Sequence, residues 1–490
     1  MNFSAIPNRR IPFVSIELDN SQAQGQSAAQ LKYVALIIAQ KLGAGPAAAD
    51  LAYRVTNAEQ VAALAGSNSM AHHAAQAWFD ANKTTPLWIG LVADPGAGAQ
   101  ATATLTLTGP ATAAGVLNIY IGGRVVRVPV AVGDTAAALA TAIVAAITAA
   151  NVIVTAAAVG AVVTLTCRHK GLTGNDLDLR LNYFDDEVTP AGLTVVATAF
   201  TGGTSAPSLA NLFSALEEQT FHIVAHPFND ASTMQVINAE LDRRWGPTVQ
   251  KAGQAITAKP GSFSTVSTWG ETSSLNAPTS TAFPSDASPT PPWEDAAATA
   301  SVIAFNGELD PARPFQTLRV PWLKPSLTPN SRFTPDERDL LLYSGIATRR
   351  VGPDGVVQLE RAITMYRKNA SGGDDVSYLD LNTRLSLMYA INDLLTVIPQ
   401  KYPRHKLGDD GVIYPPGEPI VTPTTIKGEA LAWFDRMASE SPVVFDPATR
   451  DQFKNALIAE RNGFVRVDLY VPPDLINQLL QTAVKLGFRL

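Results

Sequence analysis

The sequence predicts a multidomain α/β (α+β) protein with a discontinuous α/β core, an inserted β-rich domain, and extended N- and C-terminal β-arms. Three observations support this fold class. Buried-strand and helix patterns occur on both sides of residues 97–204, which indicates one α/β layer interrupted by an insertion. Within the interruption, short strand patterns rich in Thr, Val and Ala follow one another, several of them separated by glycine-containing turns. Alternating apolar and polar residues occur near both ends of the chain.

Length and composition limit the classes of protein that fit. The chain has 490 residues, which suggests about three domains at roughly 100–200 residues each. Charged residues make up 16 %, below the typical ~25 %, as expected for a subunit that buries much of its exterior against neighbours. A secreted Ala/Thr-rich protein would also have this composition. The net charge is −6 and no basic stripe is visible, so we expect no direct contact with nucleic acid.

The first 30 residues are interpreted as an N-terminal arm and linker. Residues 13–18 (FVSIEL) alternate apolar and polar, with Phe13, Val14, Ile16 and Leu18 as the apolar positions, and a Gln/Ala/Ser stretch follows. A strand followed by a linker lacks a neighbour to pair with and is a template for another chain. An edge strand of the chain's own sheet is an equally good interpretation of the pattern. The N-terminus has no apolar segment of the kind found in signal peptides.

Residues 31–96 are predicted to begin the α/β core. Tyr33–Ala39 and Leu87–Val92 are continuous apolar runs, typical of strands buried on both faces. Ala58–Ala65 and Met70–Asn82 are predicted helices, the second preceded by the capping residues Asn68-Ser69.

Residues 97–204 are predicted to form the inserted β-rich domain. Its helix, Thr135–Ala150, is shorter than the ~20 apolar residues that a membrane span needs, so we expect no stable membrane insertion. The expected strands are Ala103–Leu107, Leu117–Ile121, Val125–Val130, Ile153–Ala157, Val162–Cys167, Leu177–Asn182 and Leu193–Ala199.

Residues 205–345 are predicted to complete the core. Ser208–Glu218, Ala231–Arg244 and Ala296–Asn306 are predicted helices, and Thr272–Pro292, crowded with Ser, Thr and Pro, is predicted to be a surface loop. The predicted strands are Phe221–Ala225, Gln254–Lys259 and Ser262–Thr268.

The last third is predicted to hold a C-terminal domain, residues 346–472, and a C-terminal arm, residues 473–490. A hairpin around Pro353-Asp354-Gly355 is followed by predicted helices and an alternating strand. The final residues alternate again, with Val484, Leu486, Phe488 and Leu490 at the apolar positions. The predicted helices are Leu379–Gln400, Ile426–Ser439 and Thr449–Arg461, and the strand is Gly463–Val471.

Several segments, in order along the chain, resemble the contractile phage tail sheath proteins of the Mu-like type. Residues 171–180 (GLTGNDLDLR) resemble the family's G-x-x-G-N-x-(L/I) turn, and Gly463–Pro473 resembles its penultimate strand with a Pro-Pro exit. Between them, Asn211–Pro227 and Leu359–Thr364 followed by Leu379–Val397 resemble the family's helix-plus-strand step and its hairpin with a long helix. The helix-like Asp474–Ala483 departs from the commonest pattern and leaves the extent of the C-terminal arm open.

The resemblance implies a structural subunit that polymerises around a tail tube as stacked rings and contracts to drive the tube through the host envelope. The implied partners are other copies in a sixfold helical homo-oligomer, the tail tube protein, and baseplate and tail terminator proteins. The implied location is the virion tail, assembled in the host cytoplasm. The arms at Phe13, Val14, Ile16 and Leu18, and at Val484, Leu486, Phe488 and Leu490, would exchange strands with neighbouring subunits. A baseplate or adhesion-type component of a virion is the alternative.

Motifs for catalysis or cofactor binding were not found, so we expect neither an enzyme nor a cofactor or metal site. The patterns G-x-S-x-G, G-x-x-x-x-G-K-[ST] and G-x-G-x-x-G are absent. The histidines lack the cluster of about four ligands that zinc needs. The acidic pairs Asp374-Asp375 and Asp409-Asp410 stand beside glycines, which favours turns. The single cysteine, Cys167, excludes an intrachain disulfide and fits a reducing cytoplasm.

A tentative tube-facing surface is assigned to the predicted helix Ile426–Ser439. Its charged residues Lys427, Glu429, Asp435 and Arg436 stand beside Trp433 and Phe434. An exposed charged face with an aromatic stripe would suit a releasable contact. An ordinary amphipathic surface helix is an equally good interpretation.

Overall fold

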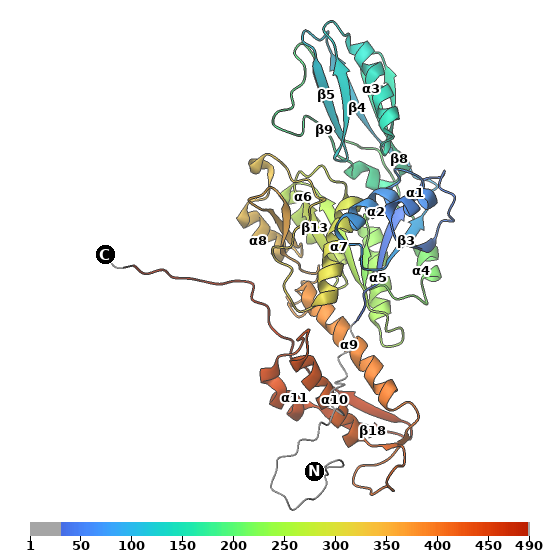
Figure 1. Cartoon of the computed structure of the whole chain (residues 1–490), viewed down its shortest axis with the longest axis vertical. Helices are drawn as coiled ribbons and strands as arrows, with labels where there is room; N and C mark the ends of the chain where they lie inside the picture. The colour runs from blue at the N-terminus through green and yellow to red at the C-terminus, as the bar shows by residue number, and fades with distance from the viewer. Residues whose placement is uncertain (1–30, 489–490) are drawn as a thin grey trace, which may run out of the picture. The chain divides into compact units, whose positions relative to one another are not determined.

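The computed structural model describes residues 31–488 and divides the chain into two compact units. Lys32–Tyr389 form the first, here called the core unit, and Ala390–Ile476 form most of the second, here called the C-terminal unit. The structure is a mixed α/β arrangement, as predicted, with several separate sheets (Figure 1). The predicted boundary at residue 346 differs from this division, because residues 346–389 pack within the core unit.

The core unit is built on a six-stranded sheet in the order β13-β12-β11-β1-β3-β2. All neighbouring pairs are parallel except β2 with β3. The apolar runs predicted as buried strands form β1 and β3 at its centre, and parallel strands with both faces covered have this composition. The strands are β1 Ala35–Gln40, β2 Leu51–Val55, β3 Leu87–Val92, β11 Ile223–Ala225, β12 Gln254–Pro260 and β13 Ser280–Ser285.

Helices cover both faces of this sheet. On one face, α4 (Ala210–Ala215) and α5 (Ala231–Trp245) pack on side chains that include Leu36 and Val224. On the other, α2 (Met70–Ala81) packs closely against α7 (Pro292–Leu309), both rich in buried alanine. Small side chains allow such close approach of two helices. Helix α1 (Ala58–Ala65) is capped by Asn57, and its neighbour α2 by Ser69.

Two predictions for this region are wrong. Residues predicted as the strand Ser262–Thr268 form helix α6 (Phe263–Gly270), because the Ser262 side chain caps it by accepting from Thr265 N. The predicted surface loop Thr272–Pro292 contains β13, which is buried along its whole length. Its polar residues are tolerated there because they find partners, such as Ser280 with Asn238.

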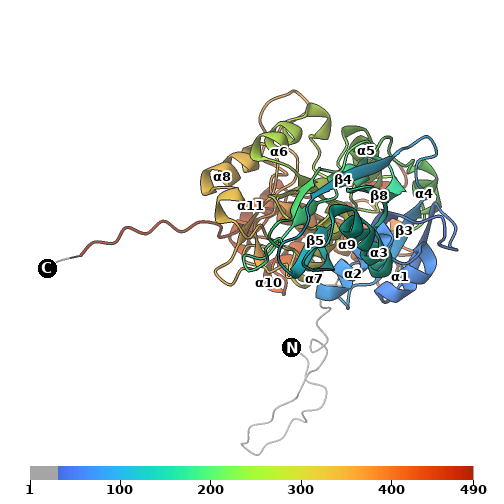
Figure 2. The ribbon, with the colours of Figure 1, turned by 90° about the horizontal axis from the view of Figure 1, so that it is seen from above.

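The insertion forms two small antiparallel sheets and one helix within the core unit (Figures 1 and 2). One sheet has the order β10-β4-β8-β7 and the other β6-β5-β9. Helix α3 (Ala136–Ala150), capped by Thr135, packs against strands of both sheets. The strands are β4 Gln100–Thr108, β5 Gly115–Ile121, β6 Arg124–Val130, β7 Val154–Val159, β8 Val162–Lys170, β9 Leu179–Leu181 and β10 Thr194–Ala197.

The core unit also contains helix α8 (Pro335–Tyr343) and the hairpin of β14 (Thr348–Val351) and β15 (Val357–Arg361). A backbone bond from Ala347 N to Ala282 O, 2.9 Å, joins the hairpin region to β13. This contact explains why residues 346–389 belong to the core unit. Helix α9 (Leu381–Lys401) has residues in both units.

The C-terminal unit has short elements around an aromatic core. Phe434 stacks on Phe453 at 4.5 Å between ring centroids, and Phe445 lies beside both Phe434 and Trp433. The predicted helix Thr449–Arg461 is too long: the helix ends at Ala456, and a strand begins at Ile458. The elements are β16 Lys406–Leu407, β17 Ile420–Val421, α10 Pro423–Ser439, α11 Arg450–Ala456, β18 Ile458–Asn462 and β19 Arg466–Tyr470.

Candidate assembly surfaces

The C-terminal segment that follows β19 is held by backbone contacts to the C-terminal unit as far as Ile476. Asp446 N donates to Asp474 O at 3.0 Å, and Ile476 N donates to Val444 O at 3.0 Å. Between these bonds, Leu475 forms an antiparallel bridge with Phe445. The helix-like reading of Asp474–Ala483 is wrong, because the segment is extended and part of it pairs as a bridge.

Beyond this tether, the predicted arm is exposed. Val484, Leu486 and Phe488 are 81, 88 and 81 % exposed and carry no regular secondary structure. Burying one such side chain is worth about 1.5–3 kcal/mol. Within the described chain, the segment therefore does not gain the free energy that burial of these side chains would provide. The predicted arm residues Phe13, Val14, Ile16, Leu18 and Leu490 lie outside the described residues.

Strands β18 and β19 form a two-stranded antiparallel hairpin in the C-terminal unit. At its turn, Phe464 and Val465 are 91 and 92 % exposed, and the strand residues Ile458 and Tyr470 are about half exposed. An isolated pair of strands is marginally stable in water, and three or more are usually needed. Within residues 31–488, the outer edges of both strands lack a ladder partner. The hairpin is therefore a suitable acceptor for added strands.

The sequence pattern missed strand β18, and a weak signal for it exists. Residues 458–462 (IAERN) precede Gly463, which adopts a φ of 68° at the turn. Glycine adopts this conformation at little cost. A glycine between two short runs of residues is therefore a signal for a β-hairpin at residues 458–470.

The tentative tube-facing residues on α10 are mostly engaged inside the C-terminal unit. Glu429 pairs with Lys401 at 2.7 Å, and Asp435 pairs with Arg450. Arg436 pairs with Asp393, which is almost fully buried. The expected exposed aromatic stripe is absent from this helix, because Trp433 and Phe434 are buried in the aromatic core. These contacts match the alternative interpretation of an amphipathic helix, and the tube contact stays a prediction.

The histidines occupy structural positions. His222 accepts from Val34 N through Nδ1 at 2.9 Å, and burial lowers its pKa to about 4. His169 lies 2.9 Å from Asp94 at the junction of insertion and core. His405 is exposed. Within residues 31–488, no group of three or more His, Cys, Asp or Glu side chains is placed to hold a metal ion.

The acidic pairs in glycine-rich loops act as turn residues. Asp375 accepts from Ser377 N and Tyr366 Oη, and Asp374 pairs with Lys368. Asp409 pairs with Arg461. Only the contact between Asp375 and Ser377 N is local to its turn; Asp374 and Asp409 form ion pairs with lysine and arginine side chains. Of the described helices, none combines the length and apolarity that crossing a membrane requires.

Comparison with known proteins identifies the family. Residues 202–365 match the phage tail sheath protein central domain, and residues 96–205 match the phage tail sheath protein beta-sandwich domain. The second match begins and ends within one residue of the insertion expected at 97–204. Over 482 residues, the chain is 36 % identical to the Mu-like prophage FluMu tail sheath protein of Haemophilus influenzae, covering 98 % of this chain and 97 % of that protein.

Two solved structures show a likeness to this chain with TM-scores just below 0.5. A sheath tail protein from Desulfitobacterium hafniense has 12 % identity, a TM-score of 0.48, and coverage of 95 % of this chain and 96 % of that one. A chain of the anti-feeding prophage baseplate has 13 % identity, a TM-score of 0.49, and coverage of 99 and 100 %. Because the sequence identity to the prophage sheath protein extends over nearly the whole chain, the protein belongs to the phage tail sheath protein family, of the Mu-like type.

Proposed function

We propose that this protein is the structural subunit of a contractile tail sheath, which polymerises around a tail tube and contracts to drive the tube through the host envelope. The observation that carries the proposal is the exposed apolar alternation at Val484, Leu486 and Phe488, together with the open hairpin β18–β19. A donor segment and an acceptor edge on one chain are the two halves of a self-assembly contact.

Strand addition explains how such a contact works. Main-chain hydrogen bonds join the added strand to the hairpin, and alternate side chains set its register. Because the donor and acceptor surfaces differ, the contact is heterologous and can propagate into rings or an open helix. The N-terminal arm at residues 13–18 would be a second donor.

The proposed setting is the tail of a virion whose parts assemble in the host cytoplasm. The partners would be further copies in sixfold stacked rings, the tail tube protein, and baseplate and tail terminator proteins. Cys167 is buried, and burial raises the pKa of its thiol to about 11, so this thiol is inert at neutral pH. Contraction would move each subunit outward while the exchanged strands stay paired.

Truncation of the full-length chain tests this proposal. Removing residues 484–490 or residues 1–18 should leave the far-UV circular dichroism and the thermal midpoint unchanged, while tubes vanish from electron micrographs. The matched control keeps the arm and its pattern: Val484→Ile with Leu486→Ile should still assemble.

Long hollow filaments from either truncated chain would contradict strand exchange through the arms. A discrete ring or trimer from the intact chain, with no filament, would instead favour the baseplate or adhesion-type component.

A further inference from the structure

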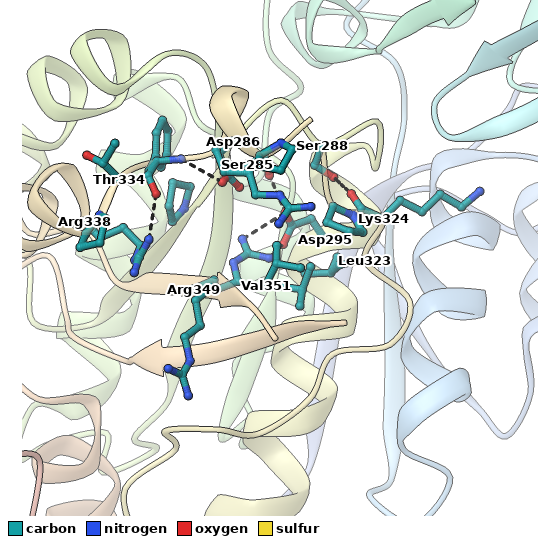
Figure 3. A pocket seen from close by; sticks show the side chains of 18 of the residues that line it. Ser285, Asp286, Ser288, Asp295, Leu323, Lys324, Thr334, Arg338, Arg349 and Val351 are labelled. Atoms are coloured by element: carbon teal, nitrogen blue, oxygen red, sulfur yellow. Dashed lines mark hydrogen bonds and ion pairs between the residues drawn. The ribbon is translucent and has the colours of Figure 1, made fainter. Parts of the chain in front are cut away.

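The six-stranded sheet of the core unit has one closed edge and one free edge. At the β13 edge, Ala347 N donates to Ala282 O at 2.9 Å. The buried pair of Arg349 and Asp295, at 2.7 Å, ties strand β14 to α7 beside it (Figure 3). A pocket of about 570 Å³ lies next to this edge, and its lining includes that pair. The β13 edge is therefore not available to an added strand.

The opposite edge, strand β2, is free. Lys41 N donates to Val92 O at 2.9 Å, so the even-numbered residues of β3 bond to β1, since alternate residues of a parallel strand bond to the same neighbour. The odd-numbered residues of β3 therefore bond to the odd-numbered residues of β2. As a result, Ala52 and Arg54 direct their N–H and C=O groups away from the sheet. Within residues 31–488 these groups have no partner.

The two faces of β2 differ in charge. Ala52 packs against the apolar cluster of α4 and α5, and Arg54 shares this face by strand alternation. Arg54 is exposed and has no ion-pair partner among the described residues. The other face carries Leu51, which is 44 % exposed, and the partly buried Tyr53. A strand that matches this edge has an acidic residue on one face and apolar residues on the other.

Residues 13–18 (FVSIEL) have this pattern. As a strand, they place the acidic Glu17 on one face and three apolar residues on the other. These apolar residues are Val14, Ile16 and Leu18. When Glu17 lies beside Arg54, the three apolar residues lie on the face of Leu51, and opposite charges on neighbouring strands stabilise the pairing. The charge and the apolar alternation therefore select the same orientation of the strand.

The start of the described chain brings this segment within reach of β2. Glu308 accepts from Tyr33 N at 3.1 Å and pairs with Lys32 at 3.2 Å, so the chain is fixed from Lys32 onward. A flexible segment of the length of residues 19–30 spans about 20 Å on average. Strand β2 lies two strand spacings, about 10 Å, from β1. The last residue of β2, Val55, lies at the end of the sheet where β1 begins.

Attachment to the same chain favours this occupant over a second copy. A short linker holds a segment at an effective concentration in the millimolar range. Residues 13–18 of other copies reach such a concentration only when subunits are already assembled. In the unassembled chain, the segment that reaches β2 first is therefore its own.

The other free edges of the core unit match residues 13–18 less well. Edge strands β7 and β10 contain no charged residue that could pair with Glu17. Edge strand β6 contains Pro129, which lacks the N–H that an added strand needs, and in β9 Arg180 already pairs with Asp178. The β14–β15 hairpin is flanked by β13 and by residues 317–320. Of the free edges in the described core unit, β2 alone combines an unpaired arginine with outward N–H groups that no proline interrupts.

We propose that in the unassembled subunit residues 13–18 of the same chain add to the free edge of β2 as a seventh strand, with Glu17 beside Arg54. This inference rests on the proposed function, because the same segment is the N-terminal donor for exchange between subunits. Pairing with β2 occupies the donor until a growing end of the polymer offers it another acceptor. It delays the polymerisation of free subunits and leaves assembled tubes unaffected.

Disulfide trapping in the full-length chain tests this pairing, below the concentration at which tubes form. Residues side by side on neighbouring strands have Cα atoms close enough for a disulfide. We expect Glu17→Cys with Arg54→Cys to link within one chain, which mass spectrometry and a non-reducing gel detect as a monomer. The native Cys167 is buried and leaves the reaction to the introduced pair. The matched control, Ile16→Cys with Arg54→Cys, places its sulfurs on opposite faces and should link about tenfold more slowly or less.

Assembly kinetics test what the pairing does. Ala52→Pro removes an outward N–H that the added strand needs without removing a bond to β3, and Arg54→Glu places like charges together. Each variant should shorten the lag before tubes appear by about threefold or more, measured by light scattering, while the tubes keep their appearance in electron micrographs. Arg54→Glu with Glu17→Arg restores an opposite-charge pair and should restore most of the lag. The control Lys83→Glu reverses an exposed charge elsewhere on the core unit and should leave the lag unchanged.

Three results would overturn the proposal. Links that form only between chains would make β2 an acceptor for a second copy. Absence of the link, or equal linking from Ile16→Cys, would show that the segment does not pair with β2 in this register. An unchanged lag in both Ala52→Pro and Arg54→Glu would show that the pairing does not control assembly. All three leave the tubes of the intact chain in place, whereas an intact chain that forms no tubes would remove the proposed function as well.

Discussion

The inserted domain and the β18–β19 hairpin are both β-structures, yet the first is complete within the chain and the second is not. The insertion pairs seven strands into two sheets, and α3 packs against both. Its apolar side chains are therefore buried within the insertion itself. The hairpin has two strands and several exposed apolar side chains. Under the proposed function, the incomplete hairpin is the β-region that other subunits would complete.

The attachment of the insertion strengthens this contrast. Asp94, where the chain leaves the core, accepts from Gln40 Nε2 at 2.7 Å and from Lys170 N at 3.0 Å. At the β5–β6 turn, Arg124 pairs with Glu294 of α7, and Trp322 donates to the same carboxylate at 2.8 Å. Such buried, shared partners fix the insertion to the core, so it would move with the core as one body.

The largest expected effect comes from changing the C-terminal arm, the proposed partner of the incomplete hairpin. Leu486→Asp combined with Phe488→Asp places charges where the arm needs apolar side chains, and polymerisation should be abolished. The thermal midpoint should not change, because both residues are exposed. Sedimentation and electron microscopy provide the measurement. The control Lys485→Asp lies on the opposite side of the alternation and should still assemble; loss of tubes there too would argue against a face-specific strand.

The second prediction separates the stabilities of the two units. Phe434 is fully buried and stacks with Phe445 and Phe453. Phe434→Ala should therefore destabilise the C-terminal unit by about 3–5 kcal/mol. Calorimetry should show one transition moving down while a second stays in place. The control Ala432→Ser changes an exposed position on α10. A common shift of the whole profile would mean that the units unfold together.

The third prediction uses pH to distinguish the units. Burial lowers the pKa of His226 in the core unit to about 4, and Asp230 offsets this only in part. The unfolded histidine takes up a proton near its usual pKa of about 6.5, so its contribution is complete above that pH. As the pH falls from 6.5 to 4, the core unit should lose about 3 kcal/mol from this group.

Urea unfolding at pH 7.5, 5.5 and 4.5 measures this dependence. His226→Leu should make the pH profile of the core unit less steep. A slope should remain, because burial also lowers the pKa of His72, His73 and His222 in this unit. His405 lies in the C-terminal unit, so His405→Leu should leave the profile of the core unit unchanged. An unaltered slope in His226→Leu would contradict the assignment.

The smallest expected effect concerns the tube-facing assignment. Asp435→Asn removes a solvent-exposed ion pair with Arg450, so the stability of the C-terminal unit should change little. If α10 faces the tube, the same variant should weaken co-assembly with the tube protein more than Asp451→Asn on α11 does. Equal co-assembly of both variants would contradict the tube-facing assignment and favour α10 as an ordinary amphipathic helix of the C-terminal unit.

Much of the fold could be predicted from local pattern. The apolar runs of β1 and β3 and the capped helices α2 and α3 were located from periodicity and cap residues, since both signals are local. The candidate site was predicted less completely. The exchange of the C-terminal arm stays a prediction from its alternation. Its proposed acceptor β18 falls in a segment predicted as a helix, because a short exposed strand has a weak periodic signal.

The sequence alone determined that the chain has a two-part α/β core, an insertion and an unpaired apolar alternation at its C-terminus. Only the tertiary structure decided that β13 is buried, that residues 346–389 belong to the core unit, and that Trp433 and Phe434 face inward. The physical reason is that polar segments become buried only when partners from distant parts of the chain, such as Asn238 for Ser280, satisfy them. Likewise, the pocket beside β13 exists because folding brings residues 284–295 and 323–357 together.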